Sequence, residues 1–276
     1  MILDKILEWA KDNDNIVSVI STGSHSRDDN KTDQFSDYDV ELIANDNKSL
    51  ANSNDWIHNF GRVVIIKAFD EGQDYPTRSA IFDGGIKVDF TLGNKQRLLN
   101  MKQNGLDSLY NRGFKVLIDK IGITNELNEP SGAPTKNIPT EKEYLDTINE
   151  FFFEVAHMPK YLLRKDLWVV KFRDWTMKEM LLKMLEWYTV SKDPSKDVWH
   201  IGSHMKDWLD NETWQELSTV YSRFEVSESW QSLLASIKLF RRISKVVGDK
   251  FHLQYPEDTD KGISDYILGY KDKFEQ

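Results

Sequence analysis

The sequence predicts an α+β fold, in which a mixed β-sheet domain flanked by helices is followed by a helical bundle. Up to about residue 120, short β-branched runs alternate with segments of helical periodicity. From Thr140 onward the periodicity is helical throughout. Between them, residues 125–139 (NELNEPSGAPTKNIP) are rich in Pro, Gly, Asn and Ser, which is typical of a linker. We therefore expect two domains, residues 1–135 and residues 136–276.

The first domain is expected to begin with an amphipathic helix and to contain six strands. Ile2, Ile6, Leu7 and Ala10 share one face of that helix. The elements that follow are predicted as strand 16–20, strand 40–43, a helix over 50–60, strand 63–69, a hairpin over 79–92, a helix after Asn94 and strand 114–119. Asp83 and Gly84 are expected to form a type I′ turn in the hairpin.

The second domain is expected to bury two apolar stripes with helical spacing. Each stripe recurs every three or four residues, so its members project from one side of a helix. The first stripe is Met177, Leu181, Met184 and Tyr188, and the second is Trp230, Leu233, Leu234, Ile237, Phe240 and Val247.

Composition excludes several classes of protein. The 276 residues are 39% apolar and 12% aromatic, which is ample for a packed core. There is no cysteine, so disulfides, thiolate zinc sites and a cysteine nucleophile are excluded. The net charge of −9 argues against a nucleic-acid-binding surface and favours a polycationic ligand. No apolar run is long enough to span a bilayer, and we expect no membrane association and a cytoplasmic protein.

Three aspartates on predicted strands are the main candidates for chemistry. Asp37 and Asp39 are two residues apart, so on a strand they project from the same face, and Asp89 joins them if its strand lies alongside. Clustered carboxylates repel one another unless a cation neutralises them, and Mg²⁺ prefers oxygen ligands that it shares with phosphates. This pattern predicts a site for two divalent cations and a nucleoside triphosphate.

Gly23 and Ser24 supply the second half of such a site. Glycine permits close backbone approach, and a short helix beginning after Ser24 would direct free N–H groups at a phosphate. Lys120, at the end of the last predicted strand, is a further candidate for contact with phosphate. A Gly-Ser pair alone is typical of a turn and an Asp-x-Asp motif alone is typical of a loop or a helix cap, so the prediction depends on their joint occurrence.

The pattern GS, then DYDVEL, then KVDFTL resembles the signature of the nucleotidyltransferase superfamily that includes DNA polymerase β. More closely, the chain resembles the bacterial aminoglycoside 6-adenylyltransferases, which modify streptomycin. The similar stretches include GSHSRDDNKTDQFSDYDVELI, IFDGGIKVDFTL and the long segment from Glu143 to Tyr188. The family usually has arginine directly after the Gly-Ser pair, whereas this chain has His25, with Arg27 two residues later.

The resemblance implies a nucleotidyltransferase-type sheet domain and transfer of AMP from ATP to an aminoglycoside hydroxyl, most simply the 6-hydroxyl of streptomycin, which gives antibiotic resistance. It implies that Asp37 and Asp39 bind two Mg²⁺ ions, with Asp89 as a further ligand or as the base. Gly23 and Ser24 would hold the triphosphate, and His25 or Arg27 would add positive charge.

For a cationic acceptor, the helical domain offers carboxylates and aromatic faces. The candidates are Asp174, Trp175, Asp166, Trp168 and Glu154, of which Asp174 is the foremost. The alternatives are a nucleotidyltransferase with another acceptor, such as another aminoglycoside or a protein hydroxyl, and a nucleotide-binding module without turnover. The sequence does not determine the oligomeric state.

Overall fold

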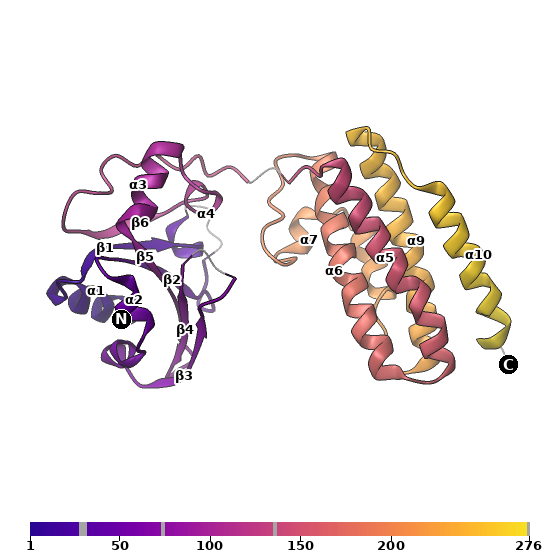
Figure 1. The fold of residues 1–276 in the computed structure, drawn as a ribbon, viewed down its shortest axis with the longest axis horizontal. Helices are drawn as coiled ribbons and strands as arrows, with labels where there is room; N and C mark the ends of the chain where they lie inside the picture. The colour runs from indigo at the N-terminus through magenta and orange to yellow at the C-terminus, as the bar shows by residue number, and fades with distance from the viewer. Residues whose placement is uncertain (28–31, 73–74, 135–136, 275–276) are drawn as a thin grey trace. The chain divides into compact units, whose positions relative to one another are not determined.

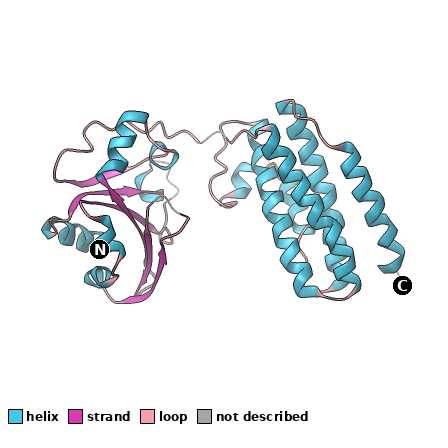
Figure 2. Cartoon of the chain, in the orientation of Figure 1, coloured by secondary structure: helices cyan, strands magenta, loops and turns pink. Residues whose placement is uncertain are grey.

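The structure is a computed structural model that describes residues 1–27, 32–72, 75–134 and 137–274. It divides into two compact units, Met1–Ala133 and Pro134–Gln276. The predicted α+β class is confirmed, because the first unit contains a six-stranded mixed sheet with helices and the second unit is helical (Figures 1 and 2). The predicted boundary between residues 135 and 136 lies outside the described residues.

The sheet has the strand order β3-β4-β5-β2-β1-β6. Its strands are β1 (Ile16–Thr22), β2 (Tyr38–Ala44), β3 (Val63–Phe69), β4 (Thr77–Phe82), β5 (Lys87–Asn94) and β6 (Lys115–Asp119). β2 and β5 pair in parallel, whereas the other neighbouring strands pair antiparallel. The parallel register places Asp39 directly beside Asp89. The sheet therefore joins two carboxylates that are far apart in the sequence.

Two sets of helices cover the two faces of this sheet. They comprise α1 (Ile2–Asp12), α2 (Asn47–Ala51), α3 (Lys95–Asn104), α4 (Ser108–Asn111) and the 3₁₀ helices η1 (Ser24–Ser26) and η2 (Asp55–Phe60). On one face, Ile6 of α1 and Phe60 of η2 pack in a core with Phe90 of β5. On the other face, Leu98 and Tyr110 form a smaller core against the sheet. The side chains of β2 thus alternate between two differently covered faces.

Two local predictions in this unit are wrong. The helix expected over residues 50–60 is interrupted between α2 and η2, where Asn52, Ser53 and Asn54 stand. Such residues bond to nearby backbone and favour turns over helix interiors. In the hairpin, positive φ occurs at Gly84 and Gly85 and not at Asp83, so the turn is not type I′ at the expected positions. The two adjacent glycines adopt this conformation without a Cβ penalty.

In its described residues, the second unit contains four long α-helices and two short ones. The long helices lie side by side (Figure 1). The long helices are α5 (Glu141–Leu163), α6 (Leu167–Lys192), α9 (Val226–Phe251) and α10 (Glu257–Phe274), and the short ones are α7 (Met205–Trp208) and α8 (Asn211–Glu216), followed by the 3₁₀ helix η3 (Leu217–Thr219). Thr140 and Glu143 form a capping box that begins α5. Such a cap stabilises a helix by about 1 kcal/mol.

The core of the second unit is aromatic. The rings of Phe151 on α5 and Phe240 on α9 stack with centroids 3.7 Å apart and planes within 2°. Nine of the ten residues in the two predicted apolar stripes are buried here, whereas Leu234 is 40% exposed. That prediction is wrong because Leu234 lies beside the stripe that Leu233 and Ile237 direct into the core.

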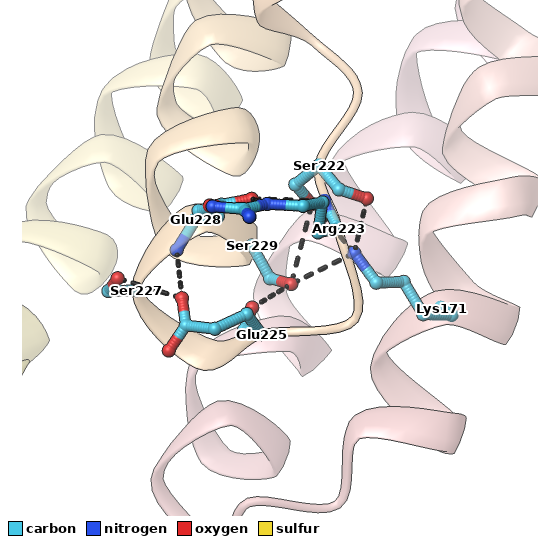
Figure 3. Close-up of polar contacts among 7 residues, drawn as sticks. All are labelled: Lys171, Ser222, Arg223, Glu225, Ser227, Glu228 and Ser229. Atoms are coloured by element: carbon cyan, nitrogen blue, oxygen red, sulfur yellow. Dashed lines mark hydrogen bonds and ion pairs between the residues drawn. The ribbon is translucent and has the colours of Figure 1, made fainter.

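A polar cluster fixes the chain before α9 against α6 (Figure 3). The Lys171 ammonium on α6 donates to the Ser222 carbonyl at 3.1 Å, to Ser222 Oγ at 2.6 Å and to Ser229 Oγ at 3.0 Å. Glu225 caps α9 by accepting from the backbone N–H of Glu228 at 2.9 Å.

Within the described residues, no helix is both long enough and apolar enough to cross a membrane.

Candidate functional site

The three predicted aspartates lie together on the sheet face opposite the α1 core. Asp37 directly precedes β2, Asp39 is the second residue of β2, and Asp89 is the third residue of β5. Asp39 is paired in register with Thr22 of β1 on one side and with Asp89 on the other. Because side chains alternate along a strand, Tyr38 is directed to the other face and packs against the α1 core.

Lys87 joins two of these carboxylates and was not among the predicted site residues. Its ammonium donates to Asp37 Oδ2 at 2.7 Å and to Asp89 Oδ2 at 3.0 Å. Burial alone would lower the pKa of Lys87, but the bonds to the two carboxylates hold it above its usual value. The available signal was the spacing in Lys-Val-Asp, because residues two apart on a strand share a face.

Asp39 is the carboxylate whose charge is least compensated. Its pKa is raised to about 6, mainly by burial and further by the charges of Asp89 and Asp37, which the charges of Lys87 and His25 offset only in part. Asp89 also presents a buried Oδ1 atom that has no hydrogen-bond partner among the described residues. This end of the sheet therefore carries negative charge that is incompletely neutralised.

Glu41, two residues after Asp39 on the same face, provides a contrast. Its buried carboxylate forms an ion pair with Arg97 and accepts a hydrogen bond from the Tyr110 hydroxyl at 2.6 Å. Arg97 also pairs with Asp107 at 2.9 Å. Glu41 is thus neutralised inside the fold, which excludes it from the group of carboxylates available to a ligand.

Gly23 permits the close approach between the turn after β1 and Asp39. Its backbone has φ 68° and ψ −155°, and a Cβ at this position would lie 1.9 Å from Asp39 Oδ2. The 3₁₀ turn Ser24–Ser26 follows at once. Ser26 Oγ anchors this turn by donating to the Thr22 carbonyl at 3.0 Å. Only glycine adopts this backbone conformation readily.

The predicted cations lie in different places. The His25 ring stacks on Tyr38 with centroids 4.5 Å apart, and Arg27 ends the 3₁₀ turn and packs against Gly113. Lys120 is not brought to the site, because its ammonium donates to the Asn13 carbonyl at 2.9 Å, near the start of β1. Lys115, which was not predicted, lies at the site end of β6 and donates to the His25 carbonyl at 3.3 Å.

The three carboxylates have the chemistry that a divalent cation requires. In the described part of the chain, no group of three or more His, Asp or Glu side chains is arranged to hold a metal ion as it stands. The Lys87 ammonium instead lies between Asp37 and Asp89. The buried, unpartnered Asp89 Oδ1 and the raised pKa of Asp39 both fit a cation that binds these oxygens.

Two of the predicted acceptor carboxylates on the helical unit already have cationic partners. Asp174 accepts from the Lys178 ammonium at 2.6 Å. Both carboxylate oxygens of Glu154 accept from Arg173 Nη1, at 3.0 and 2.9 Å. Asp166 is exposed at the N-cap of α6. Of the three carboxylates, Asp166 is therefore the one for which no such pair is present among the described residues.

The predicted tryptophans form part of an exposed aromatic stripe on α6. Trp168 is 80% exposed and Trp175 is 62% exposed, and Phe172, which was not predicted, is 71% exposed between them. The three residues are spaced at i, i+4 and i+7 and so share one side of the helix. Large exposed aromatic side chains grouped in this way are typical of binding surfaces.

A cavity of about 890 Å³ lies within the helical unit beside this stripe. Trp175 lines it, together with Tyr221 and Trp214. Glu179 and Glu186 add carboxylates, and burial raises the pKa of Glu186 to about 7. Lys178 and Lys183 line the same cavity, so it combines aromatic faces with charges of both signs. Trp175 is the predicted acceptor residue that lines it.

Comparisons with known proteins agree with the resemblance noted in the sequence. Residues 1–269 match the family described as streptomycin adenylyltransferase. Similar proteins include the aminoglycoside 6-adenylyltransferases of Bacillus subtilis strain 168 (28% identical, covering 97% of this chain and 95% of the relative) and Campylobacter jejuni (25% identical, covering 99% and 96%). The enzyme of the same name from Staphylococcus aureus is 26% identical, with 96% of each chain covered.

Among solved structures, an aminoglycoside 6-adenyltransferase from Bacillus subtilis is similar, with 25% identity, a TM-score of 0.48 and coverage of 98% of this chain and 97% of the other. The family match extends over nearly the whole sequence, including both units. The chain therefore belongs to the streptomycin adenylyltransferase family and is a nucleotidyltransferase.

Proposed function

We propose that this protein transfers AMP from ATP to a hydroxyl group of an aminoglycoside, with the 6-hydroxyl of streptomycin as the foremost acceptor. Such a reaction inactivates the antibiotic and takes place in the cytoplasm, where ATP is available. The observation that carries the proposal is the pairing of Asp39 with Asp89 in adjacent strands, beside Asp37. The family description and the names of the relatives support both the donor chemistry and the acceptor class.

Asp37, Asp39 and Asp89 would hold two Mg²⁺ ions. When bound, the ions would stabilise charge on the attacking oxygen of the acceptor and on the leaving oxygen of pyrophosphate. Asp39 fits a role as ligand because its pKa, which is about 6 without a cation, would fall when a cation binds. Asp89 is either a further ligand or the base that accepts the proton of the acceptor hydroxyl.

Gly23 and Ser24 would bind the triphosphate. Their backbone turns directly against Asp39, so a phosphate at this turn adjoins the carboxylates. His25 or Arg27 would add positive charge from the same 3₁₀ turn. We omit Lys120 from this set because its ammonium bonds to Asn13 near the other end of β1.

The aromatic and acidic surface of the helical unit would bind the acceptor. Trp168 and Trp175 offer exposed ring faces for cation–π contact, and Asp166 offers a carboxylate. Asp174 and Glu154 contribute only if the acceptor replaces Lys178 or Arg173 as their partner. The net charge of −9 favours the approach of a polycation to the whole chain.

Pyrophosphate release from ATP tests this proposal. The purified protein is incubated with ATP, Mg²⁺ and each member of a panel of aminoglycosides, and we expect the strongest signal with streptomycin. Asp37→Asn and Asp39→Asn are expected to abolish transfer without unfolding the protein, whereas Asp83→Asn, in the exposed hairpin turn, is expected to retain it. Pyrophosphate release with another aminoglycoside but not with streptomycin would refute the proposed acceptor. Full activity in Asp39→Asn would refute the metal assignment.

A further inference from the structure

Lys87 occupies a position from which it contacts two proposed metal ligands at once. It lies two residues before Asp89 on β5, so both side chains share the sheet face that carries the site. Its ammonium bridges Asp37 Oδ2 at 2.7 Å and Asp89 Oδ2 at 3.0 Å. Asp37 directly precedes β2 and Asp89 lies on β5. A cation that binds them must therefore share these oxygens with the ammonium or replace it.

The environment of Lys87 differs from that of Arg97, the cation that pairs with Glu41. Arg97 is 12% exposed and is held by both Glu41 and Asp107. Lys87 is 33% exposed, and its partner Asp37 is 43% exposed. A guanidinium holds carboxylates in a fixed planar fork, whereas an ammonium is a compact charge on a flexible stem. The Arg97 contact is thus a permanent part of the fold, and the Lys87 contact is exchangeable.

We propose that Lys87 is an exchangeable counter-cation of the metal site, which is displaced from Asp37 and Asp89 by the divalent cation and then binds a phosphate oxygen of the nucleotide. Without a cation, the ammonium offsets the repulsion among the carboxylates. This inference rests on the proposed metal-dependent transfer of AMP. In this inference, Lys87 neutralises the carboxylates when no metal is bound and binds phosphate when metal is bound.

The phosphate chain is the anion within reach of the displaced ammonium. Lys87 already acts electrostatically on Asp39, whose carboxylate lies against Gly23 in the proposed phosphate-binding turn. When a divalent cation binds Asp37 and Asp89, the ammonium loses its hydrogen bonds to both carboxylates, and two of its N–H donors become free. Phosphate oxygens that arrive with the cation satisfy these donors.

Direct binding of Mn²⁺ without nucleotide tests the displacement. We expect Lys87→Met to bind Mn²⁺ about tenfold more tightly than wild type, because no ammonium has to leave. Lys87→Arg is expected to bind Mn²⁺ more weakly than wild type, because a guanidinium fork is harder to displace. Lys67→Met removes an exposed lysine of the same sheet and controls for net charge. In the presence of a metal chelator, the melting temperature of Lys87→Met should be lower than that of Lys67→Met. Addition of Mn²⁺ should raise the melting temperature of Lys87→Met by more than that of Lys67→Met.

Binding of ATP at saturating Ca²⁺ tests the second half of the inference. We expect Lys87→Met to bind ATP about tenfold more weakly than wild type and to bind adenosine unchanged. Equal Mn²⁺ affinity in wild type, Lys87→Met and Lys87→Arg, or equal ATP affinity in wild type and Lys87→Met, overturns the inference while the proposed function stands. A wild-type protein that binds neither Mn²⁺ nor ATP overturns the proposed function, and the inference with it.

Discussion

Replacing Gly23 with alanine adds one carbon atom and is expected to lower the rate of AMP transfer by about 100-fold. Gly23 has φ 68° and ψ −155°, a conformation that L-residues rarely adopt. A Cβ at this position would lie 1.9 Å from Asp39 Oδ2 and 2.7 Å from Asp39 Cγ. Real Cβ atoms do not approach other heavy atoms so closely, so either the Asp39 carboxylate or the turn that carries Ser24 has to move.

The expected magnitude has two separable parts. The unfavourable backbone conformation costs ~1–3 kcal/mol of stability, whatever surrounds the new methyl group. Relief of the clash displaces the Asp39 carboxylate or the turn that carries Ser24 by about 1 Å, and misplacement on this scale lowers the rate of a positioned reaction by about 100-fold. Stability and activity are therefore affected for different reasons.

Gly84→Ala is the matched control because Gly84 also has a positive φ and its variant lacks the clash. Gly84 has φ 83°, and apart from its chain neighbours no atom of the described residues lies within 4 Å of the position its Cβ would take. Urea unfolding and pyrophosphate release with ATP and streptomycin are measured for both variants. We expect similar losses of stability, with a loss of transfer confined to Gly23→Ala. A Gly23→Ala enzyme that retains a rate within about fivefold of wild type would refute the reasoning, since a shift on that scale costs more.

Two further predictions concern charges inside each unit. Arg97→Leu leaves the buried Glu41 carboxylate without its cation and is expected to lower the free energy of unfolding by ~3–5 kcal/mol in urea, and a loss below about 1 kcal/mol would contradict this. Burial raises the pKa of Glu186 from 4.5 to about 7, so the folded state keeps its proton over a range in which the unfolded state releases it. As pH rises from about 4.5 to 7, the free energy of unfolding of wild type should therefore fall relative to that of Glu186→Gln, by ~1.5 kcal/mol after allowance for solvent screening. Thermal melts measure this difference. Melting temperatures that change in parallel with pH in the two proteins would exclude the effect.

The alternation of side chains made much of the sheet predictable from the sequence. The two-residue period of a strand assigned Asp37 and Asp39 to one face of the sheet and Tyr38 to the other. In the structure, Tyr38 packs against the α1 core, and Asp39 lies beside Asp89 on the opposite face. The order of strands was not predictable in the same way, because strand pairing depends on contacts distant in the sequence. The predicted approach of Asp89 depended on its strand lying beside the aspartate pair, which the parallel register of β2 and β5 confirms.

Partners of charged side chains were the part that the sequence did not predict. Asp174 was the foremost acceptor candidate, but Lys178, one turn later on α6, already holds its carboxylate. Glu154 is held in the same way by Arg173 from a different helix. Lys120 lies at the end of a strand, as expected, but at the end remote from Gly23, because β6 runs antiparallel to β1. Each outcome depends on tertiary pairing, which residue type and spacing alone do not fix.

The same limit applies to the motif at the centre of the site, and here it has a functional consequence. By sequence, Asp37, Asp39 and Glu41 alternate along one extended segment and form a uniform acidic row. The fold treats them differently: Glu41 is paired with the buried Arg97, and Asp37 is paired with the more exposed Lys87. Asp39 has no such ion pair among the described residues, and its pKa is raised, chiefly by burial. In the proposed site, a divalent cation would gain most at Asp39, would exchange with an ammonium at Asp37, and would gain nothing at Glu41. The cations that neighbouring elements supply, and not the carboxylates alone, would then determine where along the row the metal binds.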